Sequence, residues 1–364
     1  MKLLNAKKIF SALLLTAGVI LISYLPAFSA GSDSQSGEES GFNAGKFVID
    51  HVSDAYEWHI TSFGDFHVSV PLPVILYSKT SGFHTFMSSK FHHGHDAYNG
   101  FMIAHEGSWE GKIVELDPLG NIIGRPWDFS ITKTVAGVMV AAILLVFMLI
   151  WVAGKARKGV EKAPSGLYNL IEPVVVFIRD EVALPAIGPK STERFMPFLL
   201  TMFFFILFNN LLGLIPIFPF GANVSGNISV TMVLALFTFF VTNLNGNKHY
   251  WKEIFNPDVP WWMKFPIPLM PFVEFSGMFT KPFVLMVRLF ANMLAGHLIV
   301  TVFVSLIFIF TSVLGPAAGW GISPVSVAFS IFIIMLDVLV SFIQAYVFTL
   351  LSALYFGMAT AEHH

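Results

Sequence analysis

Long apolar runs occupy most of the chain after residue 130, and polar segments separate them. The first run extends from Thr134 to Ala153, the second from Phe195 to Phe220, and the third from Ile228 to Asn243. A helix of about 20 apolar residues is long enough to cross a hydrocarbon core of about 30 Å. The pattern therefore predicts an all-α polytopic membrane protein with several transmembrane helices.

The last two apolar runs are much longer than one membrane crossing requires. They extend from Pro271 to Leu314 and from Pro324 to Ala359, which is 44 and 36 residues. Continuous helices of these lengths would measure roughly 66 and 54 Å. No proline interrupts residues 283–314 or 325–359, and an ordinary tilt of about 20° would not fit such helices into a bilayer. We therefore expect a long, strongly tilted helical hairpin at the end of the chain.

The first 30 residues have the pattern of a secretory signal peptide. Lys2, Lys7 and Lys8 form a basic start, residues 9–25 are apolar, and small residues follow at a suitable cleavage position. The alternative is an uncleaved first transmembrane helix. Both interpretations place residue 31 outside the cytoplasm.

Residues 31–130 are polar and contain short alternating runs such as residues 66–70, with a turn signal at residues 117–121. We expect a small, partly β extracytoplasmic region. Eight of the 12 histidines lie here, including His92, His93 and His95. They could bind a transition metal, but no convincing pattern of third and fourth ligands accompanies them. Solvated histidines are favoured, and we expect no resident metal or cofactor.

The composition agrees with a membrane protein. Hydrophobic residues make up 55% of the chain, charged residues only 12%, and the mean hydropathy is +0.70. Soluble domains carry about 25% charged residues, so soluble, fibrous and disordered classes are excluded. The chain has no cysteine, which excludes disulfides, cysteine-ligated zinc and thiol catalysis.

The charges divide the chain into three regions. Residues 1–30 carry a net charge of +3, residues 31–130 carry −8 and residues 131–364 carry +3. A basic cluster follows the first span directly, so this end should lie in the cytoplasm and the N-terminal side outside; it comprises Lys155, Arg157, Lys158 and Lys162. Residues 161–194 are amphipathic and proline-interrupted, and we expect them along the cytoplasmic interface.

The hairpin contains very few charges at membrane depth. Arg288 is the permanently charged residue between Pro282 and Gly315, and Asp337 is the carboxylate between Pro324 and Ala361. Each costs about 2.5–3.5 kcal/mol on insertion scales, so such residues indicate function unless they simply pair with each other.

Polar residues in the hairpin fall on helical stripes. Glu274, Lys281, Arg288 and Asn292 share one stripe at spacings of seven, seven and four, and Asp337, Ser341, Gln344 and Ser352 share another. Arginine stays charged even when poorly solvated, which suits a fixed positive barrier. His297 lies roughly 180° around the helix from Arg288, and an unperturbed imidazole pKa near 6.5 suits proton exchange, which Asp337 could share.

Each of these polar residues also has a structural interpretation. For His297, a satisfied core histidine is about equally favoured. Asn209, Asn210 and Gln344 could form ordinary interhelical hydrogen bonds, and Asn292 could simply orient Arg288.

The same residues carry a family resemblance. The segment Lys281–His297, with its R-L-F-x-N-M-x-A-G core, resembles the signature of subunit a of F-type ATP synthases. Residues 344–348 with Asp337 seven residues upstream, and residues 209–216 with an N-L-x-x-L-x-P pattern, match as well. The resemblance covers about residues 131–364.

The resemblance implies specific roles. The essential arginine maps onto Arg288, its neighbouring asparagine onto Asn292 and the polar glutamine onto Gln344. His297 and Asp337 take two positions at which the family holds one histidine and one acidic residue. Glu274, Lys281, Asn209, Asn210 and Ser341 are supporting polar residues.

The family subunit is not an enzyme on its own. It is a stator in the bacterial inner membrane that contacts a ring of c subunits and the peripheral stalk b subunits, with no nucleic-acid partner. Ions cross by two half-channels and drive ATP synthesis. We expect protons, although the choice between proton and sodium is made mainly by the c subunit.

Two other classes compete with this assignment. A self-contained ion-coupled transporter would carry internal repeats and broken helices around a substrate site, and we find no repeat. A purely structural membrane protein would not explain the isolated Arg288.

Overall fold

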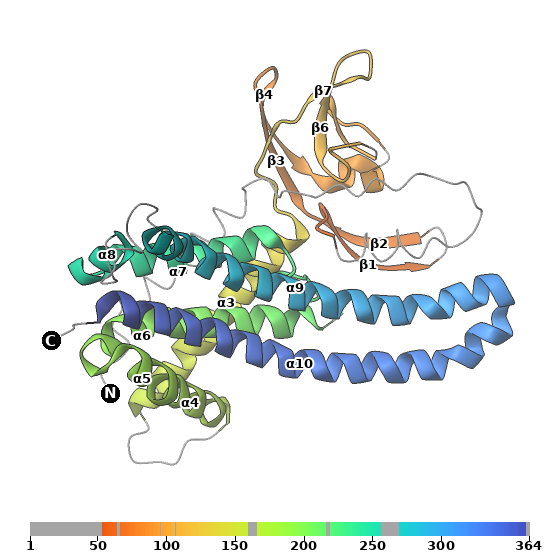
Figure 1. The fold of residues 1–364 in the computed structure, drawn as a ribbon. Coiled ribbons are helices and arrows are strands. Elements are labelled where there is room, and N and C mark those ends of the chain that lie inside the picture. Colours follow the sequence, from red (N-terminus) through yellow and green to blue (C-terminus); the bar gives the residue numbers. More distant parts are fainter. Residues whose placement is uncertain are drawn as a thin grey trace.

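A computed structural model describes residues 53–63, 66–94, 96–105, 107–158, 166–215, 219–255 and 269–361. It places a β-rich part on one side of a bundle of long helices (Figure 1). The predicted signal peptide and the start of the polar region lie outside the described residues.

The β-rich part consists of three small antiparallel sheets with strand orders β1-β2, β4-β3-β8 and β5-β6-β7. Tyr77 of β3 pairs with Phe83 of β4 and with Trp127 of β8. The elements are β1 (Glu57–Phe63), β2 (Phe66–Pro71), β3 (Pro73–Ser78), β4 (Gly82–Met87), the 3-10 helix η1 (Ser88–Gly94), β5 (Phe101–Ile103), β6 (Ile113–Leu116), β7 (Ile122–Gly124) and β8 (Trp127–Asp128).

Two of the local sequence signals in this part are confirmed. The alternating run at residues 66–70 forms β2. The turn signal joins β6 to β7, where the Gly120 amide donates to the Asp117 carbonyl over 2.7 Å, and Gly120 has a positive φ of 84°, which favours glycine. A separate small apolar core stabilises the sheets and comprises Tyr56, Val74, Leu76, Phe91, Phe101 and Ile113.

The rest of the described chain is helical, as the apolar runs predict. The helices are α3 (Lys133–Lys158), α4 (Leu167–Phe177), the π-helix η2 (Ile178–Ala183), α5 (Leu184–Ile187), α6 (Pro189–Gly213), α7 (Ile228–Leu244), α8 (Lys248–Phe255), α9 (Leu269–Leu314) and α10 (Pro316–Thr360). Among them α3, α6, α9 and α10 are long and apolar enough to span a membrane. The pair α7 and α8, bent by 106°, would make a fifth span.

The second span lies earlier in the chain than the sequence pattern indicates. The pattern gives residues 195–220, but α6 begins at Pro189 and ends at Gly213. Proline is favoured in the first turn of a helix, where its missing amide hydrogen has no intrahelical role. The more polar start of α6, with Lys190 and Arg194, is therefore helical as well, and apolar character alone misplaces both ends.

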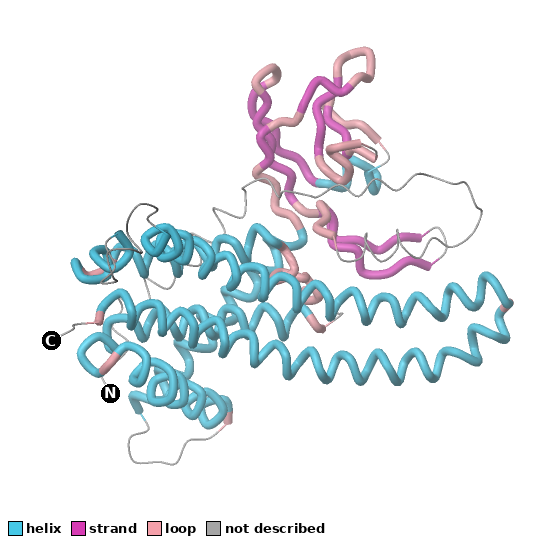
Figure 2. Tube along the Cα trace, in the orientation of Figure 1, coloured by secondary structure: helices cyan, strands magenta, loops and turns pink. Residues whose placement is uncertain are grey.

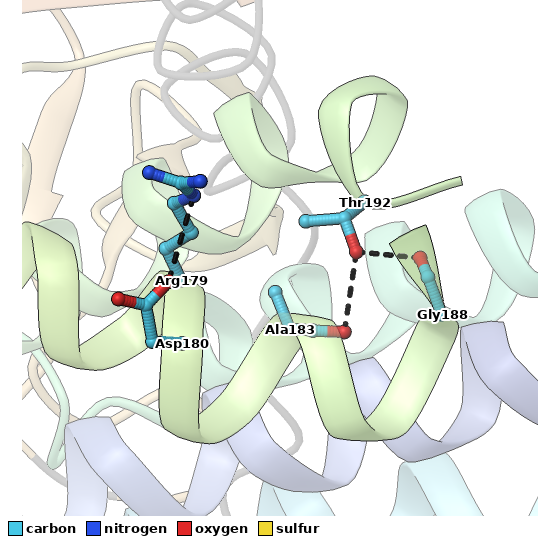
Figure 3. A network of polar contacts seen from close by, with 5 residues as sticks. All are labelled: Arg179, Asp180, Ala183, Gly188 and Thr192. Atoms are coloured by element: carbon cyan, nitrogen blue, oxygen red, sulfur yellow. Dashed lines mark hydrogen bonds and ion pairs between the residues drawn. The ribbon is translucent and has the colours of Figure 1, made fainter. Parts of the chain in front are cut away.

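The predicted amphipathic stretch before α6 forms a compact corner in its described part. Helix α4 continues into η2 and then α5, and α6 follows after Gly188. Figure 3 shows the polar contacts of this corner. The Thr192 hydroxyl donates to the Gly188 carbonyl over 2.7 Å and lies 3.4 Å from the Ala183 carbonyl. Arg179 and Asp180 form an exposed ion pair at 3.6 Å. Its position along a membrane interface stays a prediction.

The final hairpin consists of two continuous helices of 46 and 45 residues. Both continue through a proline, Pro282 in α9 and Pro324 in α10. A helix of this length measures about 69 Å, more than twice a hydrocarbon core of about 30 Å. Figures 1 and 2 show the hairpin extending well beyond the other helices. The predicted long hairpin is therefore present, and its tilt in a bilayer stays a prediction.

Burial is distributed unevenly among the spans. In the most apolar windows, 61% of α6 residues are buried but only 22% in each hairpin helix. The main apolar core gathers around α6 and contains its Leu199, Met202, Phe203 and Ile206, each fully buried. The hairpin therefore leaves most of its apolar surface available to lipid or to a partner.

Candidate functional site

Arg288 lies on an exposed face of α9, together with Asn292. It forms no hydrogen bond or ion pair with any other described residue. The surrounding exposed side chains on both hairpin helices are apolar and comprise Val284, Val287, Ile299, Met335, Leu336, Val338, Leu339, Phe342 and Ile343. A permanent charge surrounded by apolar surface requires an opposite charge or water, and no described acid forms an ion pair with Arg288.

Two other members of the predicted α9 stripe lie further toward its start. Lys281 places its ammonium 5.8 Å from the ring centre of Tyr355 on α10. Tyr355 is also close enough to Arg288 for the two groups to interact electrostatically. Glu274 is partly exposed two turns before Lys281. Lys281 and Arg288, two members of the stripe predicted from spacing, thus both lie near Tyr355 of the facing helix.

Lys281 and Tyr355 line a small, open hollow between α7, α8, α9 and α10. Its polar lining also includes Thr242, Asn243 and Tyr250. The Tyr250 hydroxyl donates to the Asn243 side-chain oxygen over 3.2 Å. A hollow that is lined by a cation and several hydroxyls is able to hold water near Lys281.

Asp337 lies directly against α9. A β-carbon added to Gly296 would stand 2.6 and 2.7 Å from the two Asp337 carboxylate oxygens, so the acid occupies the space that a larger residue would fill. Gly296 immediately precedes His297 in sequence. Asp337 therefore packs against the residue that precedes His297 on α9, and a shared role of the two titratable groups stays a prediction.

Several polar side chains are buried around this neighbourhood. The exposed fractions of Asn209 and Asn210 are 2% and 1%, that of Ser341 is 0% and that of Gln344 is 7%. Asn209 donates to the Phe205 carbonyl over 2.7 Å, and Asn210 accepts from the Ser225 hydroxyl over 2.5 Å. These bonds satisfy only part of each amide. The buried atoms Asn209 Oδ1, Asn210 Nδ2, Asp337 Oδ2 and Ser341 Oγ have no partner among the described residues.

The sequence also raised the histidines of the β-rich part as possible metal ligands. His92 is exposed at the end of η1, and His95 lies outside the described residues. Among the residues that the structure describes, no three histidine or acidic side chains come together in a group that could hold a metal ion.

Sequence reasoning missed two contributors, Tyr355 and Gly213. Tyr355 lacks a local signal because its relation to Lys281 depends on the register of two helices far apart in sequence. Gly213 is an ordinary residue of an apolar run, and only the packing of other segments against it reveals a role. For Gly296 the sequence does carry a signal, because the small residues Ala295 and Gly296 near Arg288 indicate that another helix can approach closely.

The fold and this site define a class: a multi-pass membrane protein whose long exposed hairpin carries an isolated arginine. Residues 135–357 match the family model described as ATP synthase A chain. Residues 47–129 match a family described as a domain of unknown function, DUF8433.

Individual relatives agree. Over 265 residues the chain is 43% identical to ATP synthase subunit a of Chloroherpeton thalassium, covering 70% of this chain and 75% of that protein. It is 43% identical over 244 residues to ATP synthase subunit a of Myxococcus xanthus, covering 65% and 75%. It is 44% identical over 244 residues to ATP synthase subunit a 2 of Chlorobaculum tepidum, covering 65% of each.

The chain belongs to the family of F-type ATP synthase subunit a. It is thus a membrane subunit of that complex and not itself the catalytic enzyme.

Proposed function

We propose that this chain translocates protons through two aqueous half-channels at its interface with a rotating c-ring, coupling proton flow to ATP synthesis. The observation that carries the proposal is the exposed Arg288 on an apolar hairpin face, where it has no ion pair among the residues that the structure describes. The chain acts as a stator in the bacterial inner membrane. Its N-terminal region lies outside the cytoplasm, and the peripheral stalk b subunits hold it in place.

Arg288 serves as the electrostatic barrier between the half-channels. An apolar face with one permanent cation fits a partner surface that presents one carboxylate at a time. Coulomb attraction keeps the facing carboxylate ionised, and the guanidinium cannot give up its own proton. A proton therefore cannot pass Arg288 directly and has to travel around on the ring.

The outer half-channel reaches Asp337 and His297. Both groups exchange protons, and the unsatisfied atoms of Asn209, Asn210 and Ser341 around them require water or another partner. Water-mediated hydrogen bonds are nearly as favourable as direct ones, so a file of waters would connect these groups. The imidazole and the carboxylate then pass protons toward the ring.

The inner half-channel uses the hollow that Lys281 and Tyr355 line. The basic cluster at the end of α3 supports a cytoplasmic location for the adjacent helix ends. Protons released from the ring on the far side of Arg288 would leave through this hollow. A membrane potential of 100 mV supplies about 2.3 kcal/mol for each charge that crosses, which provides the drive for rotation.

Replacement of Arg288 tests the proposal. We expect Arg288→Ala to abolish ATP synthesis driven by an imposed proton gradient in inverted membrane vesicles, while the subunit still inserts and co-purifies with the complex. Arg288→Lys should fail as well, because a poorly solvated lysine is able to lose its proton.

Arg179→Ala is the matched control. It removes an arginine from the exposed ion pair with Asp180, and exposed pairs contribute only about 0–1 kcal/mol, so synthesis should stay normal. Coupled synthesis in the Arg288→Ala complex would contradict the barrier role.

A further inference from the structure

A second hollow lies between α3, α6 and the segment that joins α6 to α7. It is a small, open hollow lined by Gly137 and Ala141 of α3, Asn209 and Gly213 of α6, and Ala222 of the connecting segment, among others. Gly137 and Ala141 belong to the first turns of α3, close to where this helix leaves the β-rich part (Figure 1). The hollow is therefore at the end of the bundle that faces the N-terminal region.

The walls of this hollow are fixed by close packing. A β-carbon on Gly137 would lie 2.5 Å from the Ala222 β-carbon, so α3 rests directly on the connecting segment. The Gly221 amide donates to the Leu212 carbonyl over 3.1 Å. The Ser225 hydroxyl donates to Asn210 over 2.5 Å. The connecting segment is thus tied back onto the end of α6.

Gly213 forms the inner wall of the hollow. A β-carbon at this position would stand 3.7 Å from Nε2 of His297 and 3.0 Å from the carbonyl oxygen of Ala222. Because glycine has no side chain, Gly213 contributes only its backbone to the wall between the hollow and the His297 imidazole. Any larger residue would narrow this passage.

Buried polar atoms without described partners belong to one residue that lines the hollow and to two residues that are adjacent in sequence to lining residues. Asn209 lines the hollow, and its Oδ1 has no partner among the described residues, although only 2% of the residue is exposed. Nδ2 of Asn210 and Nδ2 of Asn223 lack described partners as well. Buried polar groups of this kind are usually satisfied by ordered water. The orphaned amides therefore indicate water where the cavity and Gly213 provide room for it.

We propose that Gly213 is the aperture of the outer half-channel: water enters through the hollow between α3 and α6, passes the face of Gly213 and reaches His297. This inference rests on the proposed function. Asn209 and Asn210 are positioning residues that form hydrogen bonds with the waters. Gly213 leaves room for the waters because it has no side chain. The pathway beyond His297 continues along Gly296 to Asp337.

A pair of near-isosteric variants separates a water passage from simple packing. Gly213→Ala and Gly213→Ser place the same β-carbon at the aperture and meet the same Ala222 oxygen, but only serine offers a hydroxyl that can continue a hydrogen-bond chain. We expect Gly213→Ala to lower proton flux about fivefold, equivalent to the ~1 kcal/mol that one hydrogen bond contributes. Gly213→Ser should retain most of the flux.

The flux is measured as pH-dye quenching during gradient-driven turnover in inverted vesicles with equal amounts of assembled complex. Gly154→Ala on α3 is the control, since a β-carbon there meets nothing within 4 Å. Equal flux in the alanine and serine variants, whether both normal or both reduced, would overturn the aperture. If Gly213→Ala conducts normally while Arg288→Ala is uncoupled, the aperture fails and the proposed function stands. Coupled synthesis in Arg288→Ala would reject the proposed function itself.

Discussion

At the scale of single residues, the site depends on glycines, which leave room for neighbouring groups because they have no side chain. Asp337 fits against α9 only because residue 296 is glycine, and a β-carbon there would be 2.8 Å from the carboxylate carbon. Such a distance is well inside van der Waals contact. The glycine therefore sets the position of the acid relative to His297, the next residue on the same helix.

Replacing this glycine should disturb proton transfer without unfolding the hairpin. We expect Gly296→Ala to displace the Asp337 carboxylate and reduce gradient-driven ATP synthesis severalfold, with normal amounts of subunit in the membrane because alanine favours helices. Gly321→Ala, on α10, is the control because its β-carbon meets nothing within 4 Å. Unchanged synthesis in Gly296→Ala would show that the position of Asp337 is unimportant.

At the scale of elements, the start of α3 is joined to the β-rich part by specific hydrogen bonds. The Lys133 amide donates to the Ala55 carbonyl over 2.8 Å, and the Thr134 amide donates to Oδ1 of Asp54 over 2.9 Å. Asp54 thus satisfies a free amide in the first turn of α3 in the manner of an N-cap. Trp58 of β1 also belongs to the main apolar core of the helices. The two parts are therefore packed against each other.

Loss of this cap should loosen the junction. We expect Asp54→Ala to raise the rate of proteolysis at the connection of residues 129–133 about fivefold, because loss of a cap costs ~1 kcal/mol and cleavage follows the population of the open form. Asp54→Asn keeps a side-chain carbonyl acceptor and should behave nearly as the native chain does. Equal proteolysis of the native and Asp54→Ala chains would contradict the capping role.

At the scale of the whole molecule, the sequence pattern predicts the class, the long hairpin and the residues on its stripes. Apolar run lengths are sufficient for this, because predominantly apolar runs as long as residues 271–314 and 324–359 are typical of membrane-spanning helices. The ends of α6 and the kink between α7 and α8 are not predicted, since caps, prolines and tertiary packing decide helix ends. Gly213 and Tyr355 are also beyond sequence reasoning, because their roles arise from contacts between distant segments.

The central claim is that the face of the hairpin around Arg288 meets a carboxylate-bearing ring. Disulfide cross-linking tests it with no background, because the chain has no cysteine. Ile299 lies 11 residues from Arg288 on the same helical face and is 43% exposed, whereas Phe147 on α3 is 70% exposed. We predict that Ile299→Cys cross-links to single cysteines along the outer helix of the c subunit and that Phe147→Cys does not. Cross-linking through Phe147→Cys with none through Ile299→Cys would contradict the account.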